Sequence, residues 1–153
     1  MPKKMLVPVS MGPLAQHLVE YGHSLAYRLN VEVSFAHILP DPKSWMGYDS
    51  WIPASTMKPA EESARKKILY WITKAEEDLP ENPRHKHKIF FDQGNPPEAI
   101  IRIAKNNGIN LIVMGYRSTS TIKTLVLGST ATMVARHAHC SVMIYRPGFD
   151  PFE

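Results

Sequence analysis

The chain has 153 residues, one cysteine and an apolar fraction of 44%, which are typical of a single globular domain with its own core. This composition excludes a disordered tail, a collagen and a coiled coil, and the lone cysteine excludes an intrachain disulfide. The formal net charge is +4, but the basic residues stand in separate short runs. We therefore interpret them as solvated surface and expect no nucleic-acid partner.

No apolar run comes near the roughly 18 residues that a membrane span requires. The N-terminus, Met1–Lys4, is followed by a short apolar run without a small-residue cleavage site, so it does not resemble a signal peptide. Because neither an export signal nor a disulfide is evident, we expect a cytoplasmic protein.

The first forty residues predict a strand, a helix and a second strand. Met5–Val9 is a nearly continuous apolar run, typical of a strand buried on both faces. From Leu14 to Leu29 apolar residues recur at helical spacing; Ser10 could cap this helix, and Asn30 ends it. Residues 31–38 alternate between apolar and polar side chains and predict the second strand.

Residues 39–58 form a connection that is long for a compact domain. It contains three prolines and several aromatic side chains but no regular period. Three interpretations stay open: core packed over the second helix, a lid over a ligand site, or a surface that binds a partner.

The second half repeats the alternation of helices and strands. A helix is expected from about Pro59 to Leu79, then a strand at Lys88–Phe91. Asn95 is a strong cap for the next helix, which Asn107–Gly108 ends. Leu111–Met114 is a buried strand that ends at Gly115, which lets the chain turn sharply away.

After a Ser/Thr-rich loop, Gly128–Ser129 opens the last helix, and Ser141–Tyr145 is the last strand. The resulting order predicts an α/β fold: a single doubly wound domain with a parallel sheet and helices on both faces. In such sheets a ligand binds at the carboxyl ends of the strands, where the strand order reverses. The candidate site is therefore the segment from Pro8 to Gly12 facing the segment from Gly115 to Thr130.

The segment 114–130 has features of a phosphate cradle. Its loop is rich in hydroxyl groups, and Gly128–Ser129 begins a helix whose free N–H groups attract anions. Arg117 and Lys123 could balance anionic charge. The alternative is an ordinary helix, capped by Ser129, after an ordinary loop.

Five segments of the chain together resemble the universal stress protein family: Val7–Ser10, Ala36–Leu39, Val113–Gly115, Leu127–Thr130 and Arg136–Val142. The resemblance covers nearly the whole chain and implies a flavodoxin-like sheet of five parallel strands in the order 3-2-1-4-5. It also implies a cytoplasmic homodimer. Many members bind ATP through the pattern Gly-x2-Gly-x9-Gly-(Ser/Thr), and others do not.

The family's pattern falls on Gly115, Ser118, Gly128 and Ser129 with its spacing intact. Ser118 departs from it, because the family has glycine there. Ser10 is a second departure, since ATP-binding members usually have an aspartate after the first strand. A serine cannot bind two ribose hydroxyls as a carboxylate can.

The resemblance implies adenine near Val9, Ile38 and Met114, and phosphates over Ser118 and the start of the last helix. The full set of expected nucleotide-binding residues is Pro8, Val9, Ser10, Ile38, Met114, Gly115, Arg117, Ser118, Gly128, Ser129 and Thr130.

Catalytic and metal sites are not expected. The chain has neither a Gly-x-Ser-x-Gly elbow nor a complete P-loop. His85 and His87 could converge on a strand, but no second pair stands at zinc-finger spacing. The segment from His137 to Cys140 is interpreted as the turn into the last strand, with Cys140 an inert thiol.

We therefore expect a stress-response regulator that binds ATP or a related adenine nucleotide and is not an enzyme. The nucleotide would order the 116–127 loop and alter the surface offered to a regulatory protein partner. The fully apolar run Val142–Tyr145 would pair with its copy in a homodimer. The alternatives are a nucleotide-independent interaction module, in which Ser10 and Ser118 mark a lost site, and a weak ATPase.

Overall fold

The computed structural model describes residues 3–40, 57–77, 87–118 and 125–148. Five strands form the main sheet: β1 (Lys4–Pro8), β2 (Glu32–Pro40), β3 (Lys88–Gly94), β4 (Leu111–Gly115) and β7 (Ser141–Tyr145). The helices are α1 (Ala15–Leu29), α3 (Met57–Glu77), α4 (Pro96–Asn106) and α5 (Ser129–His137). Two short strands, β5 (Arg117–Ser118) and β6 (Leu125–Val126), form a separate pair.

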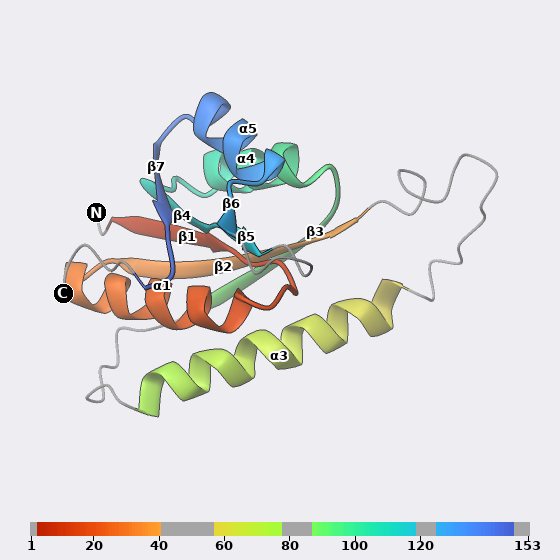
Figure 1. Ribbon diagram of the computed structural model, residues 1–153, viewed down its shortest axis with the longest axis vertical. Coiled ribbons are helices and arrows are strands. Elements are labelled where there is room, and N and C mark those ends of the chain that lie inside the picture. The colour runs from red at the N-terminus through yellow and green to blue at the C-terminus, as the bar shows by residue number, and fades with distance from the viewer. Residues whose placement is uncertain (1–2, 41–56, 78–86, 119–124, 149–153) are drawn as a thin grey trace.

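The main sheet is parallel, with the strand order β3-β2-β1-β4-β7. This is the flavodoxin-like order 3-2-1-4-5, so the predicted fold is confirmed. Helices α1 and α3 cover one face of the sheet, and α4 and α5 cover the other (Figure 1).

Strand β1 shows why the sheet needs two layers of helices. Met5 and Val7 belong to the core under α1 and α3, whereas Leu6 belongs to the core under α4 and α5. All three are fully buried, because successive side chains of a strand point to opposite faces. The central positions of a strand covered on both faces must all be apolar, as Met5 to Val7 are, whereas Lys4 at the start of β1 is only partly buried.

Two of the predicted helix ends are confirmed. The Asn95 side chain accepts a hydrogen bond from the backbone N–H of Glu98 at 3.3 Å, with Pro96 in the first helical position. Asn30 ends α1 in the left-handed conformation, with φ of 53°. Asparagine tolerates this conformation better than most residues.

The predicted cap of α1 is wrong. Leu14, not Ser10, is the N-cap, and no side chain among the described residues caps that helix. The backbone makes the first turn instead, since the N–H of Ala15 donates to the carbonyl of Gly12 at 3.1 Å. Helix α5 opens at Gly128–Ser129 as predicted, with Gly128 as the N-cap, so the alternative of a Ser129 cap does not hold.

Strand β3 is longer than predicted because its neighbour continues beside it. β2 runs to Pro40, and the register from His37 opposite Phe91 to Pro40 opposite Gly94 extends both strands. The short pair of β5 with β6 was not predicted at all, since its four residues carry no strand period.

Residues 41–56 of the long connection lie outside the described residues, so its three interpretations stay predictions. None of the helices in the ranges that the structure describes is long and apolar enough to cross a membrane.

Candidate functional site

A cavity of about 700 Å³ opens at the carboxyl ends of β1 and β4. This is the point where the strand order reverses, and its volume lies in the range of small-molecule sites. Nine of the eleven predicted residues line it: Pro8, Val9, Ser10, Ile38, Met114, Gly115, Gly128, Ser129 and Thr130. The side chains of Arg117 and Ser118 lie outside the described part of the chain.

One side of the cavity is apolar. Val9 and Met114 are buried at the ends of β1 and β4, and Ile38 is half-buried on β2. Leu18 of α1 and Ile100 of α4 add apolar surface from the two helical layers. Such a surface suits a flat heterocycle more than a charged group.

The start of α5 forms another side of the cavity. Gly128 is the N-cap, and Ser129, Thr130 and Ala131 of the first turn also line the space. Among the residues that the structure describes, no side chain caps this helix end. The first-turn N–H groups and the positive end of the helix dipole therefore lie next to the cavity, which is an arrangement that attracts anions.

Gly115 does not make the sharp turn that was predicted for it. It is paired with Tyr145 inside the sheet and is not among the glycines with positive φ. The N–H of Tyr116 still donates to the carbonyl of Tyr145 at 3.3 Å. The chain therefore follows β7 for one more residue.

His37 is a cavity residue that the sequence analysis missed. It is buried on β2, and its Nδ1 lies 2.7 Å from the carbonyl oxygen of Val9. Because a carbonyl only accepts, Nδ1 carries the proton and donates. The histidine thus holds the end of β1 against β2. Of the segment Ala36–Leu39, only Ile38 is among the predicted site residues.

Met11, Gly12 and Tyr116 also line the cavity, and they lie inside the two segments that were predicted to face each other. Pro13, Leu14 and Tyr145 line it as well but were not predicted. The Tyr145 ring is stacked on Tyr21 of α1, with centroids 3.9 Å apart. Only the fold brings β7 and α1 together, so no local pattern could have signalled this pair.

Comparison with known proteins gives a consistent picture. The model of the universal stress protein family matches residues 1–146. A universal stress protein of Methanothermobacter thermautotrophicus is 26% identical over 150 residues, which cover 94% of this chain and 95% of that protein. The universal stress protein YxiE of Bacillus subtilis is 27% identical over 147 residues, covering 94% and 98%.

Solved structures agree with the fold. Hypothetical protein MJ0577 superposes with a TM-score of 0.73 at 22% identity, covering 98% of this chain and 99% of that one. A universal stress protein of Archaeoglobus fulgidus in complex with dAMP has a TM-score of 0.64 at 19% identity, covering 93% and 96%. A universal stress protein in complex with cAMP also has a TM-score of 0.64, at 17% identity, covering 95% and 97%. From its sequence order, its sheet topology and the match over nearly its full length, the chain belongs to the universal stress protein family.

Proposed function

We propose that this chain is a stress-response regulator that binds an adenine nucleotide in the cavity between β1 and β4. The observation that carries the proposal is the cavity itself, which joins an apolar side to the uncapped start of α5. A nucleotide has the matching halves: an apolar base and an anionic phosphate. The two family members solved with dAMP and with cAMP support adenine as the base.

In the proposed complex, the base lies against Val9, Ile38 and Met114. The phosphates lie at Gly128, Ser129 and Thr130, where backbone N–H groups replace water as donors. ATP is the specific ligand that we expect. Ser10 lines the cavity in place of the family's usual aspartate, so the ribose loses a carboxylate partner. We therefore expect weaker binding than a carboxylate at this position would support.

The experiment begins with nucleotide released from the purified protein, identified by mass spectrometry. Calorimetric titration with ATP, ADP, AMP and cAMP follows. We expect measurable affinity for at least one of them. An empty protein that gives no heat at millimolar concentrations would contradict nucleotide binding and favour the nucleotide-independent interaction module. Steady release of phosphate from ATP would favour the weak ATPase.

The variant Gly128→Leu tests where the phosphates bind. The φ of Gly128 is −68°, which any residue can adopt, so the substitution is compatible with the backbone and adds bulk at the cavity. We expect at least a tenfold loss of nucleotide affinity (about 1.4 kcal/mol) with an unchanged circular dichroism spectrum. Ala135→Leu is the matched control, because Ala135 is exposed on the same helix and away from the cavity. Unchanged affinity in Gly128→Leu would show that the phosphates lie elsewhere.

We also propose a homodimer that forms through the outer edge of β7. The proposal is supported by the position of β7 at the edge of the sheet and by its four consecutive apolar residues, Val142–Tyr145. Pairing with a second copy would cover this edge without any additional partner.

A further inference from the structure

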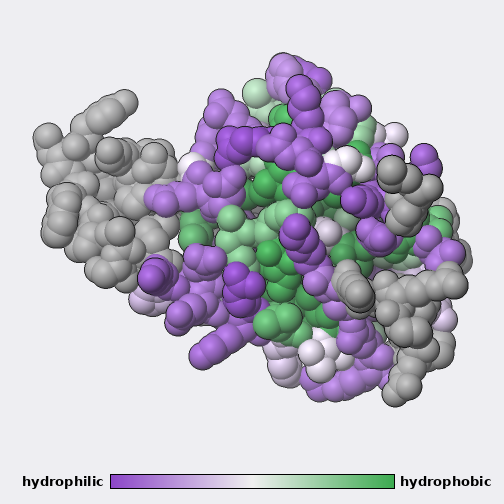
Figure 2. All heavy atoms as spheres, turned by 180° about the vertical axis from the view of Figure 1, so that it is seen from behind, coloured by the Kyte–Doolittle hydropathy of each residue, from purple (hydrophilic) through white to green (hydrophobic). Residues whose placement is uncertain are grey.

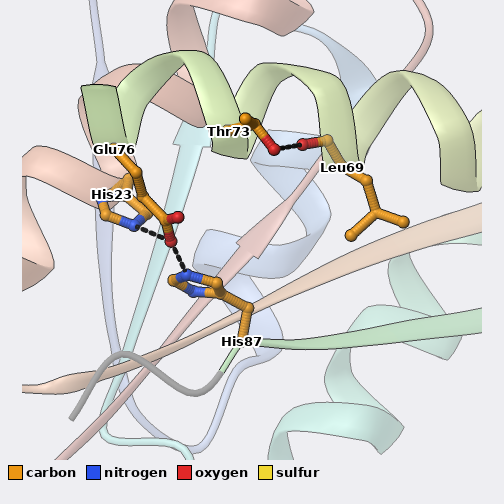
Figure 3. A network of polar contacts seen from close by, with 5 residues as sticks. All are labelled: His23, Leu69, Thr73, Glu76 and His87. Carbon is orange, nitrogen blue, oxygen red and sulfur yellow. Dashed lines mark hydrogen bonds and ion pairs between the residues drawn. The ribbon is translucent and has the colours of Figure 1, made fainter. Parts of the chain in front are cut away.

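A cluster of three potential metal ligands lies on the α1 and α3 side of the sheet, apart from the cavity. His23 comes from α1, Glu76 from the last turn of α3, and His87 immediately precedes β3. Figure 3 shows both imidazole rings directed at the same carboxylate. None of the three residues lines the nucleotide cavity.

The three donor atoms converge closely enough to share one ion. Nε2 of His23 lies 3.4 Å from Oε1 of Glu76, and Nε2 of His87 is hydrogen-bonded to the same oxygen. All three atoms lie within 4.8 Å of one another. A tetrahedral zinc ion with bonds of 2.0–2.2 Å would hold its donors about 3.4 Å apart. Small movements of the most exposed member, Glu76, can complete this geometry.

The two imidazole rings are packed inside the protein, whereas the carboxylate is exposed. The His23 side chain is completely buried and that of His87 is 14% exposed, whereas the Glu76 side chain is 44% exposed. The His87 ring also contacts the buried Phe35, with centroids 6.4 Å apart. The two histidines are therefore preorganised, and the carboxylate faces solvent, from which an ion can enter.

We propose that His23, Glu76 and His87 bind a single Zn²⁺ ion through the two Nε2 atoms and the Glu76 carboxylate, with a water molecule at the fourth position. Two imidazoles and one carboxylate are a donor set that zinc favours. Magnesium and calcium prefer oxygen ligands throughout, so they are poor candidates. The ion would fasten the end of α3 to α1 and to the start of β3. Its role is structural and does not depend on nucleotide binding.

The test uses tag-free protein that has been treated with a chelator and titrated with ZnCl₂ by calorimetry. We expect one equivalent of zinc to bind. At a hundredfold excess over the dissociation constant, the unfolding midpoint should rise by about 5 °C or more. Cobalt(II) as a replacement should give the visible absorption of a tetrahedral site.

Two variants identify the ligands without touching the fully buried His23. Glu76→Gln and His87→Gln should each weaken zinc binding at least tenfold and abolish the rise in midpoint. Glu77→Gln and His17→Gln are matched controls, because these residues are exposed neighbours on the same helices as Glu76 and His23. Both controls should bind zinc like the parent chain.

Two results would overturn the proposal. One is a parent chain that takes up no zinc, which would leave the cluster as a hydrogen-bonded His–Glu–His triad. The other is binding that survives both ligand variants, since zinc would then occupy other histidines. Folding of the variants is checked by circular dichroism, so that lost binding is not confused with lost structure.

Discussion

At the scale of single residues, Gly22 controls how closely α1 approaches the sheet. A Cβ atom added at this glycine would lie 2.7 Å from Cγ2 of Val7. Val7 is completely buried and β-branched, so it has little freedom to move away. Glycine in a helix normally costs about 1 kcal/mol relative to alanine. Here the close contact with β1 outweighs that cost.

We therefore predict that Gly22→Ala lowers the free energy of unfolding by about 1–3 kcal/mol, the usual cost of overpacking. The measurement is urea denaturation within a double-mutant cycle with Val7→Ala. In the Val7→Ala background the clash is gone, so Gly22→Ala should be neutral or stabilising. Equal effects of Gly22→Ala in both backgrounds would mean that Val7 does not limit the approach of the helix.

Some residues of the candidate site could be predicted from local sequence signals, and others could not. Gly128 and Ser129 could be assigned because a glycine before a helix start is a local signal. His37 could not, because its role depends on the carbonyl of Val9, a residue of the neighbouring strand. The members of the His23–Glu76–His87 cluster are up to 64 positions apart in the chain, so no local spacing indicates it. The predicted convergence of His85 and His87 joins residues only two positions apart, and His85 lies outside the described residues.

At the scale of elements, an ion pair links β3 to the helix that follows it. Nη2 of Arg102 on α4 donates to Oδ2 of Asp92 on β3 at 2.6 Å. The hydrogen bond from Arg102 lowers the pKa of Asp92, aided by the backbone N–H of Gln93 and the charge of Arg102, while burial acts in the opposite direction. Both side chains are partly exposed, so the contribution of the pair is small and screened by salt.

The lowered pKa of Asp92 determines how the free energy of unfolding changes with pH. A carboxyl group with a depressed pKa in the folded state stabilises that state above its unfolded pKa of about 3.9. This contribution disappears as the pH falls through the folded pKa. We predict that the parent chain is more stable than Asp92→Asn at pH 6 and that the difference shrinks below about pH 4.

Urea denaturation over this pH range measures the difference. Glu98→Gln is the control, because Glu98 is an exposed acidic residue of the same helix and takes no part in this pair. A constant difference between parent and Asp92→Asn across the whole range would contradict the predicted link.

Helices and strands could be predicted from the sequence where the pattern that indicates them lies within a few neighbouring residues. The apolar runs of β1 and β4, the cap at Asn95 and the end at Asn30 each depend on a few neighbouring residues. The extension of β3 to Gly94 and the pairing of β5 with β6 depend on a partner strand. Such pairing supplies hydrogen bonds to residues whose own pattern does not predict a strand.

At the scale of the whole molecule, the two edges of the main sheet are not alike. On β3, Lys88 lies over the Phe90 ring at 4.8 Å, and Arg65 of α3 lies over the Phe91 ring at 4.5 Å. Lys88 is thus a charged residue on the edge strand itself, a feature that disfavours pairing with another chain. Strand β7, at the opposite edge of the main sheet, carries no charged residue between Ser141 and Tyr145. Seen from behind, the molecule shows apolar surface at its centre, bordered by hydrophilic side chains (Figure 2).

The geometry of β7 allows a specific test of the proposed dimer. The carbonyl of Tyr145 faces β4, since it accepts from Tyr116. Because backbone polar groups alternate along a strand, those of Ile144 face the free edge. We predict that Ile144→Pro removes a donor from the dimer contact, while the hydrogen bonds to β4 remain. Analytical ultracentrifugation should then show monomers.

Ile144→Ala is the matched control for this variant. It loses similar packing against the core but keeps its backbone N–H, so it should stay dimeric. A parent chain that sediments as a monomer would refute the dimer. An Ile144→Pro variant that remains dimeric would place the contact on another surface.

The sequence by itself predicts the order of strands and helices, the sheet with two covered faces and the end of the cavity formed by α5. They follow from apolar periodicity, glycines and caps, which act over a few positions of the chain. The contact of His37 with β1, the stacking of Tyr21 on Tyr145 and the convergence of His23, Glu76 and His87 arise only on folding. Each of them joins side chains that are distant in sequence, and their distances are set by how the helices pack on the sheet. The proposed nucleotide site therefore depends largely on local patterns, whereas the proposed zinc site depends entirely on packing.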